Sequence, residues 1–234
     1  MKSFRKAASV ALAAVLCAGI AAVPAAGAAQ RETEQFDRTI PFHAGGTLKL
    51  DNFSGRVTIT ATNGTDIVIH ATRHATRERL DRIHIGVDVD SSQVSIEANR
   101  KDASWHEDSD NVVDTDFDIQ VPRQTNLDVK VFSSGIQVAG VSGREKLHTF
   151  SGWVRVTDAT GPMDAETFSG DIDVAFAGSV DGEVDFDSFS GRLNSSRPVT
   201  LRTSSRRSRV HGEIGNGGGT QLRFKTFSGD VTLR

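Results

Sequence analysis

Short stretches of alternating apolar and polar residues recur along most of the chain. Val57 and Ile59, Val154 and Val156, and Ile172 and Val174 are each separated by one residue. A period of two is typical of β-strands that bury one face. The pattern therefore predicts an all-β protein. In the first half it predicts strands over Gln35–Ile40, Thr47–Leu50, Arg56–Thr60, Asp66–Ala71, Ile83–Asp88, Val94–Ala98, Thr115–Val121 and Asn126–Val131, with a short helix over Thr76–Arg82.

The tripeptide Phe-Ser-Gly recurs inside a longer repeated pattern. Copies begin at Phe53, Phe150, Phe168, Phe189 and Phe227, and a stretched copy runs from Phe132 to Gly135. From Phe132 onward the intervals are 18, 18, 21 and 38 residues. A fixed period of this size indicates stacked structural units. Each unit reads as a strand, a tight Ser-Gly corner and a second strand.

These units predict a β-solenoid of strand–turn–strand rungs of about 18–21 residues, preceded by a less regular N-terminal β-region. Residues 30–131 form that region and cap, and residues 132–234 form the repeat solenoid. We expect the phenylalanines to stack as an internal column, so that losing one buried ring costs roughly 3–5 kcal/mol.

The last third of the chain departs from the repeat. The 38-residue interval before Phe227 predicts a degenerate rung over Val199–Ser205 and Arg209–His211, with Ser204 in the place of the phenylalanine. The segment Asp230–Arg234 then ends on a strand, which we expect to lie at an open sheet edge where a partner strand can pair.

The N-terminus has the pattern of a secretory signal peptide over residues 1–29. Lys2, Arg5 and Lys6 precede the apolar run Ala7–Val23 and a small-residue stretch. The alternatives are an uncleaved membrane anchor or a lipoprotein signal at Cys17, the only cysteine. Cleavage predicts an extracytoplasmic protein, periplasmic or secreted, without disulfides. No later apolar stretch is long enough to span a membrane.

Charge argues against a nucleic-acid partner. Three of the 27 basic residues lie in the leader, which leaves 24 against 30 acidic residues and a net charge of −6. The seven histidines lack zinc-ligand spacing, and no nucleophile elbow or phosphate loop is present. We therefore predict no cofactor, no bound metal and no catalytic residues.

Two charged groups are candidate binding surfaces. Acidic residues on successive predicted strands alternate with apolar ones and could share one face. Such a face could bind Ca²⁺ or supply the paired carboxylates of a glycoside hydrolase. The simpler interpretation is a solvated outer face. This acidic face comprises Asp171, Asp173, Asp181, Glu183, Asp185 and Asp187. The basic patch, suited to an anionic polysaccharide or phosphate group, comprises Arg197, Arg202, Arg206, Arg207 and Arg209.

A second acidic group comprises Glu107, Asp108, Asp110, Asp114, Asp116 and Asp118. Its calcium-loop pattern fails at Ile119, where glycine is required, so a loop followed by a solvated strand is predicted.

The repeats resemble those of the bacterial "putative adhesin" family, β-strand-repeat envelope proteins that contain a domain of unknown function related to head-GIN adhesin domains. Phe117–Pro122, Leu127–Val131 and Gly135–Val138 resemble it too, and the similarity covers residues 47–234. The resemblance implies an all-β solenoid outside the cytoplasm without known catalytic activity. We therefore expect a non-enzymatic, adhesin-like envelope module that binds a polysaccharide or another protein. The alternatives are a carbohydrate-active enzyme and a polyanion or cell-wall sensor.

Overall fold

A computed structural model describes residues 31–101, 112–206 and 209–234, without the side chains of residues 203–206. Met1–Gln30 and Arg31–Arg234 separate into two units. The signal-peptide prediction, with Cys17, therefore lies outside the described residues. None of the helices in the described ranges is long and apolar enough to cross a membrane.

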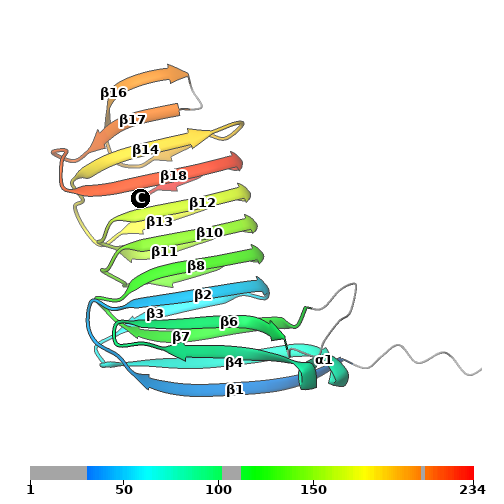
Figure 1. The fold of residues 1–234 in the computed structure, drawn as a ribbon. Coiled ribbons are helices and arrows are strands. Elements are labelled where there is room, and N and C mark those ends of the chain that lie inside the picture. Colours follow the sequence, from blue (N-terminus) through cyan, green and yellow to red (C-terminus); the bar gives the residue numbers. More distant parts are fainter. Residues whose placement is uncertain (1–30, 102–111, 207–208) are drawn as a thin grey trace, which may run out of the picture. The chain divides into compact units, whose positions relative to one another are not determined.

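The described residues form nineteen strands and one short helix, arranged as two sheets (Figure 1). Sheet A has nine strands in the order β1-β4-β7-β3-β9-β11-β13-β19-β15. These are β1 (Arg31–Pro41), β4 (Asp66–Thr76), β7 (Asp114–Pro122), β3 (Val57–Thr62), β9 (Ile136–Ala139), β11 (Val154–Ala159), β13 (Ile172–Phe176), β19 (Val231–Leu233) and β15 (Leu193–Ser195).

Sheet B has ten strands in the order β16-β17-β14-β18-β12-β10-β8-β2-β6-β5. These are β16 (Val199–Arg206), β17 (Arg209–Ile214), β14 (Gly182–Ser188), β18 (Thr220–Ser228), β12 (Met163–Ser169), β10 (Glu145–Ser151), β8 (Asn126–Ser133), β2 (Thr47–Ser54), β6 (Gln93–Lys101) and β5 (Ile83–Val89). The helix α1 spans Arg77–Arg82. The strands and the helix predicted in the first half are all present.

Each Phe-Ser-Gly repeat is one rung that joins the two sheets. Its first strand lies in sheet B, the corner follows, and its second strand lies in sheet A. Neighbouring rungs pair in parallel with equivalent residues level, as Thr149 with Thr167 and Val154 with Ile172 show. The predicted solenoid is therefore confirmed. The sheets continue across residue 131, because β2 pairs with β8 and β3 with β9.

The buried faces of the two sheets share one hydrophobic core. Leu147 on β10 and Val154 and Val156 on β11 are almost fully buried, and their equivalents repeat in the other rungs. A second, small cluster beside α1 contains Leu80, Ile83, Ala75 and Val113. Alternation along each strand therefore fills the interior, as the sequence pattern predicts.

The phenylalanines form the predicted column, but the prediction that they are buried is wrong. Their exposed fractions run from 43% at Phe53 to 74% at Phe189. The buried residue of each corner is the one before the ring, such as Thr149 or Thr167. Leu147 and Thr149 point inward together, so Phe150 must point outward. Removing a half-exposed ring should cost roughly 1–2 kcal/mol, below the cost expected for a core ring.

The rungs do not stack in chain order. The last rung, β18–β19, lies between β12–β13 and β14–β15. The prediction that Asp230–Arg234 ends at an open edge is therefore wrong. The predicted degenerate rung is wrong too, because β16 and β17 form an antiparallel hairpin that extends sheet B alone.

Candidate functional site

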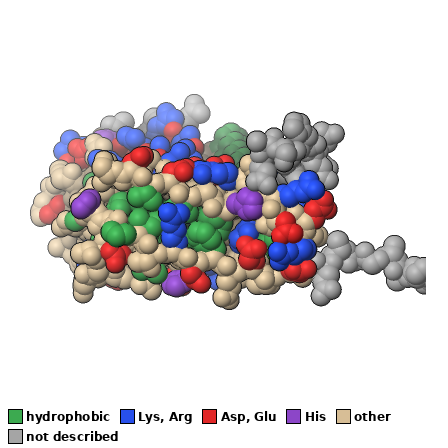
Figure 2. All heavy atoms as spheres, turned by 60° about the horizontal axis from the view of Figure 1, so that its bottom comes forward, with side chains coloured by type: hydrophobic (Ala, Val, Ile, Leu, Met, Phe, Trp, Pro, Cys, Tyr) green, Lys and Arg blue, Asp and Glu red, His purple; other side chains and the backbone are tan. Residues whose placement is uncertain are grey.

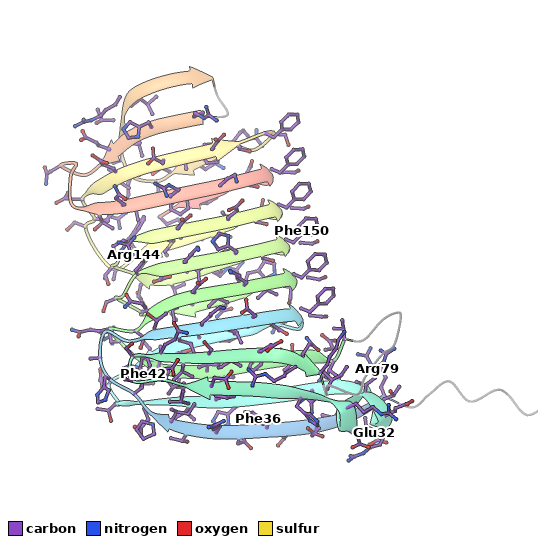
Figure 3. The ribbon with its side chains drawn as sticks, in the orientation of Figure 1. Glu32, Phe36, Phe42, Arg79, Arg144 and Phe150 are labelled. Atoms are coloured by element: carbon purple, nitrogen blue, oxygen red, sulfur yellow. The ribbon has the colours of Figure 1, made fainter. Side chains whose placement is uncertain are left out.

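Six phenylalanine rings lie in a single exposed row at the corners of the rungs, and we call this row the phenylalanine column. It runs in the order Phe53, Phe132, Phe150, Phe168, Phe227 and Phe189. Neighbouring ring centroids are 4.6–4.9 Å apart and the ring planes differ by 1–15°. Figure 3 shows the row projecting from one side, with Phe150 labelled. Each inner ring is covered on both faces by its neighbours and presents only its edge to solvent.

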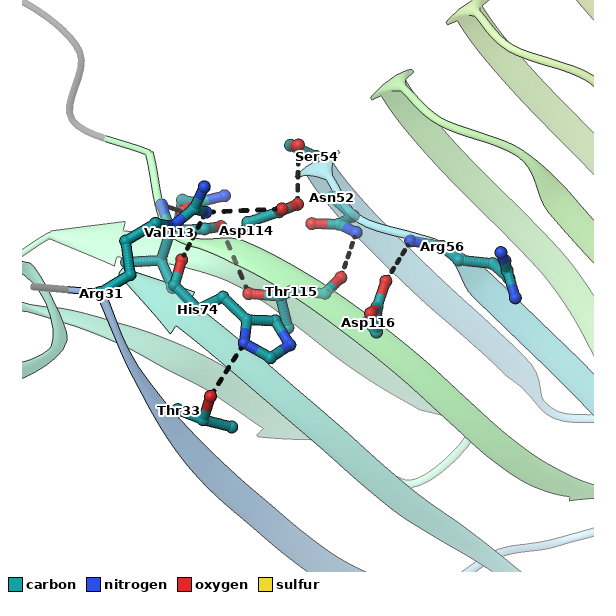
Figure 4. Close-up of polar contacts among 11 residues, drawn as sticks. Arg31, Thr33, Asn52, Ser54, Arg56, His74, Val113, Asp114, Thr115 and Asp116 are labelled. Atoms are coloured by element: carbon teal, nitrogen blue, oxygen red, sulfur yellow. Dashed lines mark hydrogen bonds and ion pairs between the residues drawn. The ribbon is translucent and has the colours of Figure 1, made fainter. Parts of the chain in front are cut away.

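Buried polar side chains hold the corners that carry the column. The Thr149 hydroxyl donates to the Ser134 carbonyl oxygen at 2.9 Å, and the Thr167 hydroxyl donates to that of Gly152 at 3.1 Å. At the first rung the Asn52 amide donates to the Thr115 carbonyl oxygen at 2.9 Å (Figure 4). These bonds fix Asn52, Thr149 and Thr167 inside their corners.

The corner glycines are required because adjacent rungs touch there. A Cβ atom at Gly152 would overlap the carbonyl oxygen of Ser134, and one at Gly170 would overlap that of Gly152. Gly170 also has a φ of +148°, which favours glycine. The Phe-Ser-Gly repeat therefore combines an outward ring with a corner that can stack closely.

Charged residues flank the column on the sheet B side. Each lies two positions before a ring, and their strands place them level with one another. Lys225 Nζ lies 2.8 Å from Glu166 Oε1, and His148 Nδ1 lies 3.4 Å from Glu166 Oε2. The hydrogen bond to Glu166 raises the pKa of Lys225. In column order the sheet B row is Asp51, Lys130, His148, Glu166, Lys225 and Asp187.

A second row flanks the column on the sheet A side, just after each corner. Its carboxylates accept from backbone N–H groups of the next rung: Asp171 from Asp230 at 2.8 Å, and Asp230 from Arg192 at 2.9 Å. The backbone N–H of Arg56 donates to Asp116 at 2.7 Å (Figure 4). In column order the sheet A row is Arg56, Gly135, Trp153, Asp171, Asp230 and Arg192, so the Phe132 corner has no side chain in this row. Both rows mix charges of both signs, so the column is apolar between nearly neutral borders.

In the described part of the chain three hollows lie against the column, one near Phe189 and two near Phe53; the one between Phe53, His74 and Asp114 measures about 380 Å³. The first, of about 350 Å³, is lined by the last three rings together with Glu166, Asp187 and Lys225. The second, of about 370 Å³, is lined by Phe53 and Phe132 together with Asp51, Glu97 and Lys130. Each hollow has an aromatic wall and a charged rim. The surface around the column is therefore uneven and has recesses beside the rings.

The structure does not bring the predicted acidic face together. Asp171 and Asp173 belong to the sheet A part of their rung, whereas Asp181, Glu183, Asp185 and Asp187 belong to β14 in sheet B or just precede it. Asp173 contacts Arg234 at 3.0 Å, Asp185 contacts His211 at 2.6 Å, and Asp187 contacts Arg209 at 2.7 Å. Within the described ranges no group of three or more His, Cys, Asp or Glu residues could hold a metal.

The predicted basic patch is partly described. Arg202 is ion-paired with Glu213 and Arg209 with Asp187, while the Arg197 guanidinium lies 5.7 Å from the centre of the Phe176 ring. The Arg206 side chain and Arg207 lie outside the described residues. An anion site on this patch stays a prediction.

The second acidic group also divides. Asp114, Asp116 and Asp118 lie on the predicted strand, β7, where they alternate with the buried Thr115 and Phe117; Glu107, Asp108 and Asp110 lie outside the described residues. Asp114 accepts from Ser54 at 2.8 Å and lies 3.6 Å from the Arg31 guanidinium (Figure 4). On the face shown in Figure 2, basic, acidic and histidine side chains are interspersed with apolar ones.

The fold and this surface define an all-β solenoid with an exposed aromatic column. A family model, Toastrack DUF4097, matches residues 108–234, and the chain belongs to that family. The resemblance to bacterial adhesin-like proteins is thereby confirmed. No curated protein matches the sequence.

Several solved bacterial structures are similar to the chain, and one of them shares its fold. A putative cell adhesion protein from Clostridium sporogenes is 11% identical, covers 86% of this chain and 99% of its own, and superposes with a TM-score of 0.64. A putative adhesin from Bacteroides fragilis is 11% identical over 86% of this chain and 97% of its own, with a TM-score of 0.26. A putative lipid binding protein from Parabacteroides distasonis is 8% identical over 86% and 96%, with a TM-score of 0.29. At such identities only the fold of the first neighbour informs the present chain.

Proposed function

We propose that the chain is a non-enzymatic binding module of the bacterial cell envelope, working outside the cytoplasm, and that the phenylalanine column is its contact surface. The observation that carries this proposal is the row of six half-exposed rings at regular spacing. Contiguous exposed apolar surface on a soluble domain commonly marks an interaction site. The signal-peptide pattern at residues 1–29 supports the extracytoplasmic location.

The column is suited to binding because its rings are already ordered. Each ring is stacked on its neighbours, and several corners are also held by buried hydrogen bonds, such as that from Thr149 to Ser134. Binding of a partner therefore requires little further ordering of side chains on this surface, so its entropic cost is low. The nearly neutral flanking rows add little long-range attraction, so contact depends mainly on burying the ring edges.

The two alternatives have weaker support. A carbohydrate-active enzyme needs two carboxylates that face one substrate. Asp173 and Asp185 lie on different sheets, and each contacts a basic partner. A polyanion sensor needs unpaired basic charge, whereas Arg202 and Arg209 are ion-paired. We rank both below the binding module.

Binding to isolated bacterial cell walls and to a glycan array tests the proposal, with the chain from residue 30 onward. The double variant Phe150→Ser/Phe168→Ser removes two central rings. Val89→Ser, at a 46% exposed apolar residue on β5 away from the column, is the matched control. We expect the column variant to lose at least about tenfold in affinity, equal to about 1.4 kcal/mol, while the control binds like the parent.

Circular dichroism must show that all three proteins are folded. Equal binding by the parent and the column variant would contradict the proposal. Binding that is lost only in Arg202→Ala/Arg209→Ala, and that weakens with salt, would favour the polyanion sensor.

A further inference from the structure

We propose that the column binds a second copy of this chain, side by side and in parallel, so that each ring meets the same ring of its partner. This inference rests on the proposed function, because it names the partner of the same surface. Three features of the described residues lead to it: the direction of the rings, their spacing, and the order of charges in the two flanking rows.

The direction of the rings excludes partners that stack on aromatic faces. Nucleic-acid bases bind aromatic side chains through the ring face. In the column those faces are covered by the neighbouring rings, at centroid distances of 4.6–4.9 Å. Phe53 and Phe189 stand at the two ends, each with a single stacked neighbour, and Phe189 is 74% exposed. The four inner rings offer only edges, which suit an apolar surface that presents ring edges at the same spacing.

The spacing of the rings favours a partner with the same repeat. A second column has ridges at the same intervals, including the shorter 4.6 Å step between Phe53 and Phe132. Two identical surfaces related by a two-fold axis form a closed dimer, the commonest kind of oligomer. Every ring then contributes, whereas an irregular apolar partner meets only some of them.

The charge order selects between the two possible two-fold arrangements. In the antiparallel arrangement the sheet B row faces its own copy in reverse. Asp51 then meets the partner's Asp187, and Lys130 meets the partner's Lys225. Like charges therefore oppose each other twice over, which is unfavourable.

In the parallel arrangement the sheet B row of one copy faces the sheet A row of the other at the same level. Asp51 then faces the partner's Arg56, Lys225 faces the partner's Asp230, and Asp187 faces the partner's Arg192. Each of these pairs is opposite in charge and occurs twice by symmetry. The one like-charged level places Glu166 beside the partner's Asp171, and Glu166 already has Lys225 at 2.8 Å. The geometry therefore favours the parallel dimer.

Sedimentation equilibrium over a range of protein concentrations tests self-association. We expect a reversible dimer for the parent and for Val89→Ser. We expect dimerisation to weaken at least about tenfold for Phe150→Ser/Phe168→Ser. Asp51→Arg should weaken the dimer, and the exchange Asp51→Arg/Arg56→Asp should restore it. A chain that stays monomeric at every concentration, or an exchange that fails to restore association, overturns the inference.

Crosslinking with a short bismaleimide tests the parallel orientation. Because the only cysteine of the chain lies in the leader, an introduced cysteine is the only thiol of the mature chain. Ser133 and Ser228 are exposed corner serines three rungs apart. In the parallel dimer, Ser133→Cys and Ser228→Cys each crosslink to themselves, and a mixture gives no mixed product. Ser91→Cys, in the turn before β6, is the control, which we expect to form no crosslinked dimer.

Mixed products alone indicate the antiparallel dimer and overturn the proposed orientation. Failure of this inference can be distinguished from failure of the proposed function. If the parent is monomeric and Phe150→Ser/Phe168→Ser still loses cell-wall binding, the column is a binding surface for another partner. If the parent dimerises and all variants bind cell walls equally, the column serves self-association alone.

Discussion

The direction of one side chain at each corner determines the chemistry of this surface. Leu147, Thr149 and Phe150 lie close together near the end of β10. Residues two apart in a strand share a face, so Leu147 and Thr149 are buried together and Phe150 points outward. Leu147 and Phe150 are three residues apart, an odd interval. The same parity holds in the other regular rungs, and it builds an external column.

Gly152 is predicted to be intolerant of even the smallest side chain. A methyl group there would overlap the carbonyl oxygen of Ser134 in the adjacent rung, so the rungs would have to separate. Gly152→Ala should lower the free energy of unfolding by roughly 1–3 kcal/mol, the usual cost of overpacking. Urea denaturation measures it. Gly64→Ala is the control, because its Cβ would meet only the Thr62 hydroxyl, at 3.4 Å. Equal stability of the two variants would show that the rungs do not touch there.

Glu145 is a buried carboxylic acid at the start of β10. It is 1% exposed, lies level with Leu127 and Met163, and neither carboxyl oxygen has a hydrogen-bond partner. Removal from water disfavours its charged form and raises its pKa from 4.5 to about 8. The folded protein therefore holds this proton at neutral pH, and the sequence pattern alone did not single out the residue.

The raised pKa of Glu145 predicts a stability that falls as pH rises. Because the folded state binds the proton more tightly, the stabilisation is complete below about pH 4.5 and is lost as the pH approaches 8. Glu145→Gln removes this dependence. The variant should gain on the order of 3–5 kcal/mol relative to the parent between pH 4.5 and pH 8, at about 1.4 kcal/mol per pKa unit. Urea denaturation of both proteins at the two pH values measures the difference. A constant difference would mean that Glu145 is ionised in the folded protein.

The order of the elements differs from their order in the chain. β18 lies between β12 and β14, and β19 lies between β13 and β15. The C-terminal rung is therefore internal and contributes Phe227 to the column. Along the chain, the outer rung β14–β15 and the hairpin β16–β17 come before β18–β19, which lies between that outer rung and the earlier ones.

Removal of the last rung should destabilise the part of the chain that precedes it. Ending the chain at Gly219 deletes β18 and β19, so β14 and β15 lose their parallel partners. We expect residues 182–214 to lose protection from amide hydrogen exchange, while β2, β8 and β10 keep it. Hydrogen exchange followed by mass spectrometry measures both regions. If β14 stayed protected, the rung would not be holding that end of the molecule.

At the scale of the whole unit, the two sheets end differently. Sheet B extends past its last parallel strand, β14, by the antiparallel hairpin β17–β16, whereas sheet A ends at the three-residue strand β15. At the other end, antiparallel strands β4 and β1 complete sheet A and β5 completes sheet B. Antiparallel and short terminal strands of this kind limit uncontrolled pairing at the ends of a solenoid. The column therefore runs along the parallel middle of the unit, and the ends serve as caps.

The sequence alone determined the strands, the corners and the stacking of the repeats, because alternation and glycine placement act through neighbouring residues. The interval of three between the buried apolar residue and the ring reverses the face, and our prediction of an internal column overlooked this signal. Only the tertiary structure decided which rung lies beside which. Neighbouring rungs pair through their backbones, and equivalent rungs offer the same pairing, so the local sequence does not decide which rungs become neighbours. In the folded protein Phe227 lies between Phe168 and Phe189. The same pairing places Asp173 and Asp185 on different sheets and leaves Glu145 without a partner.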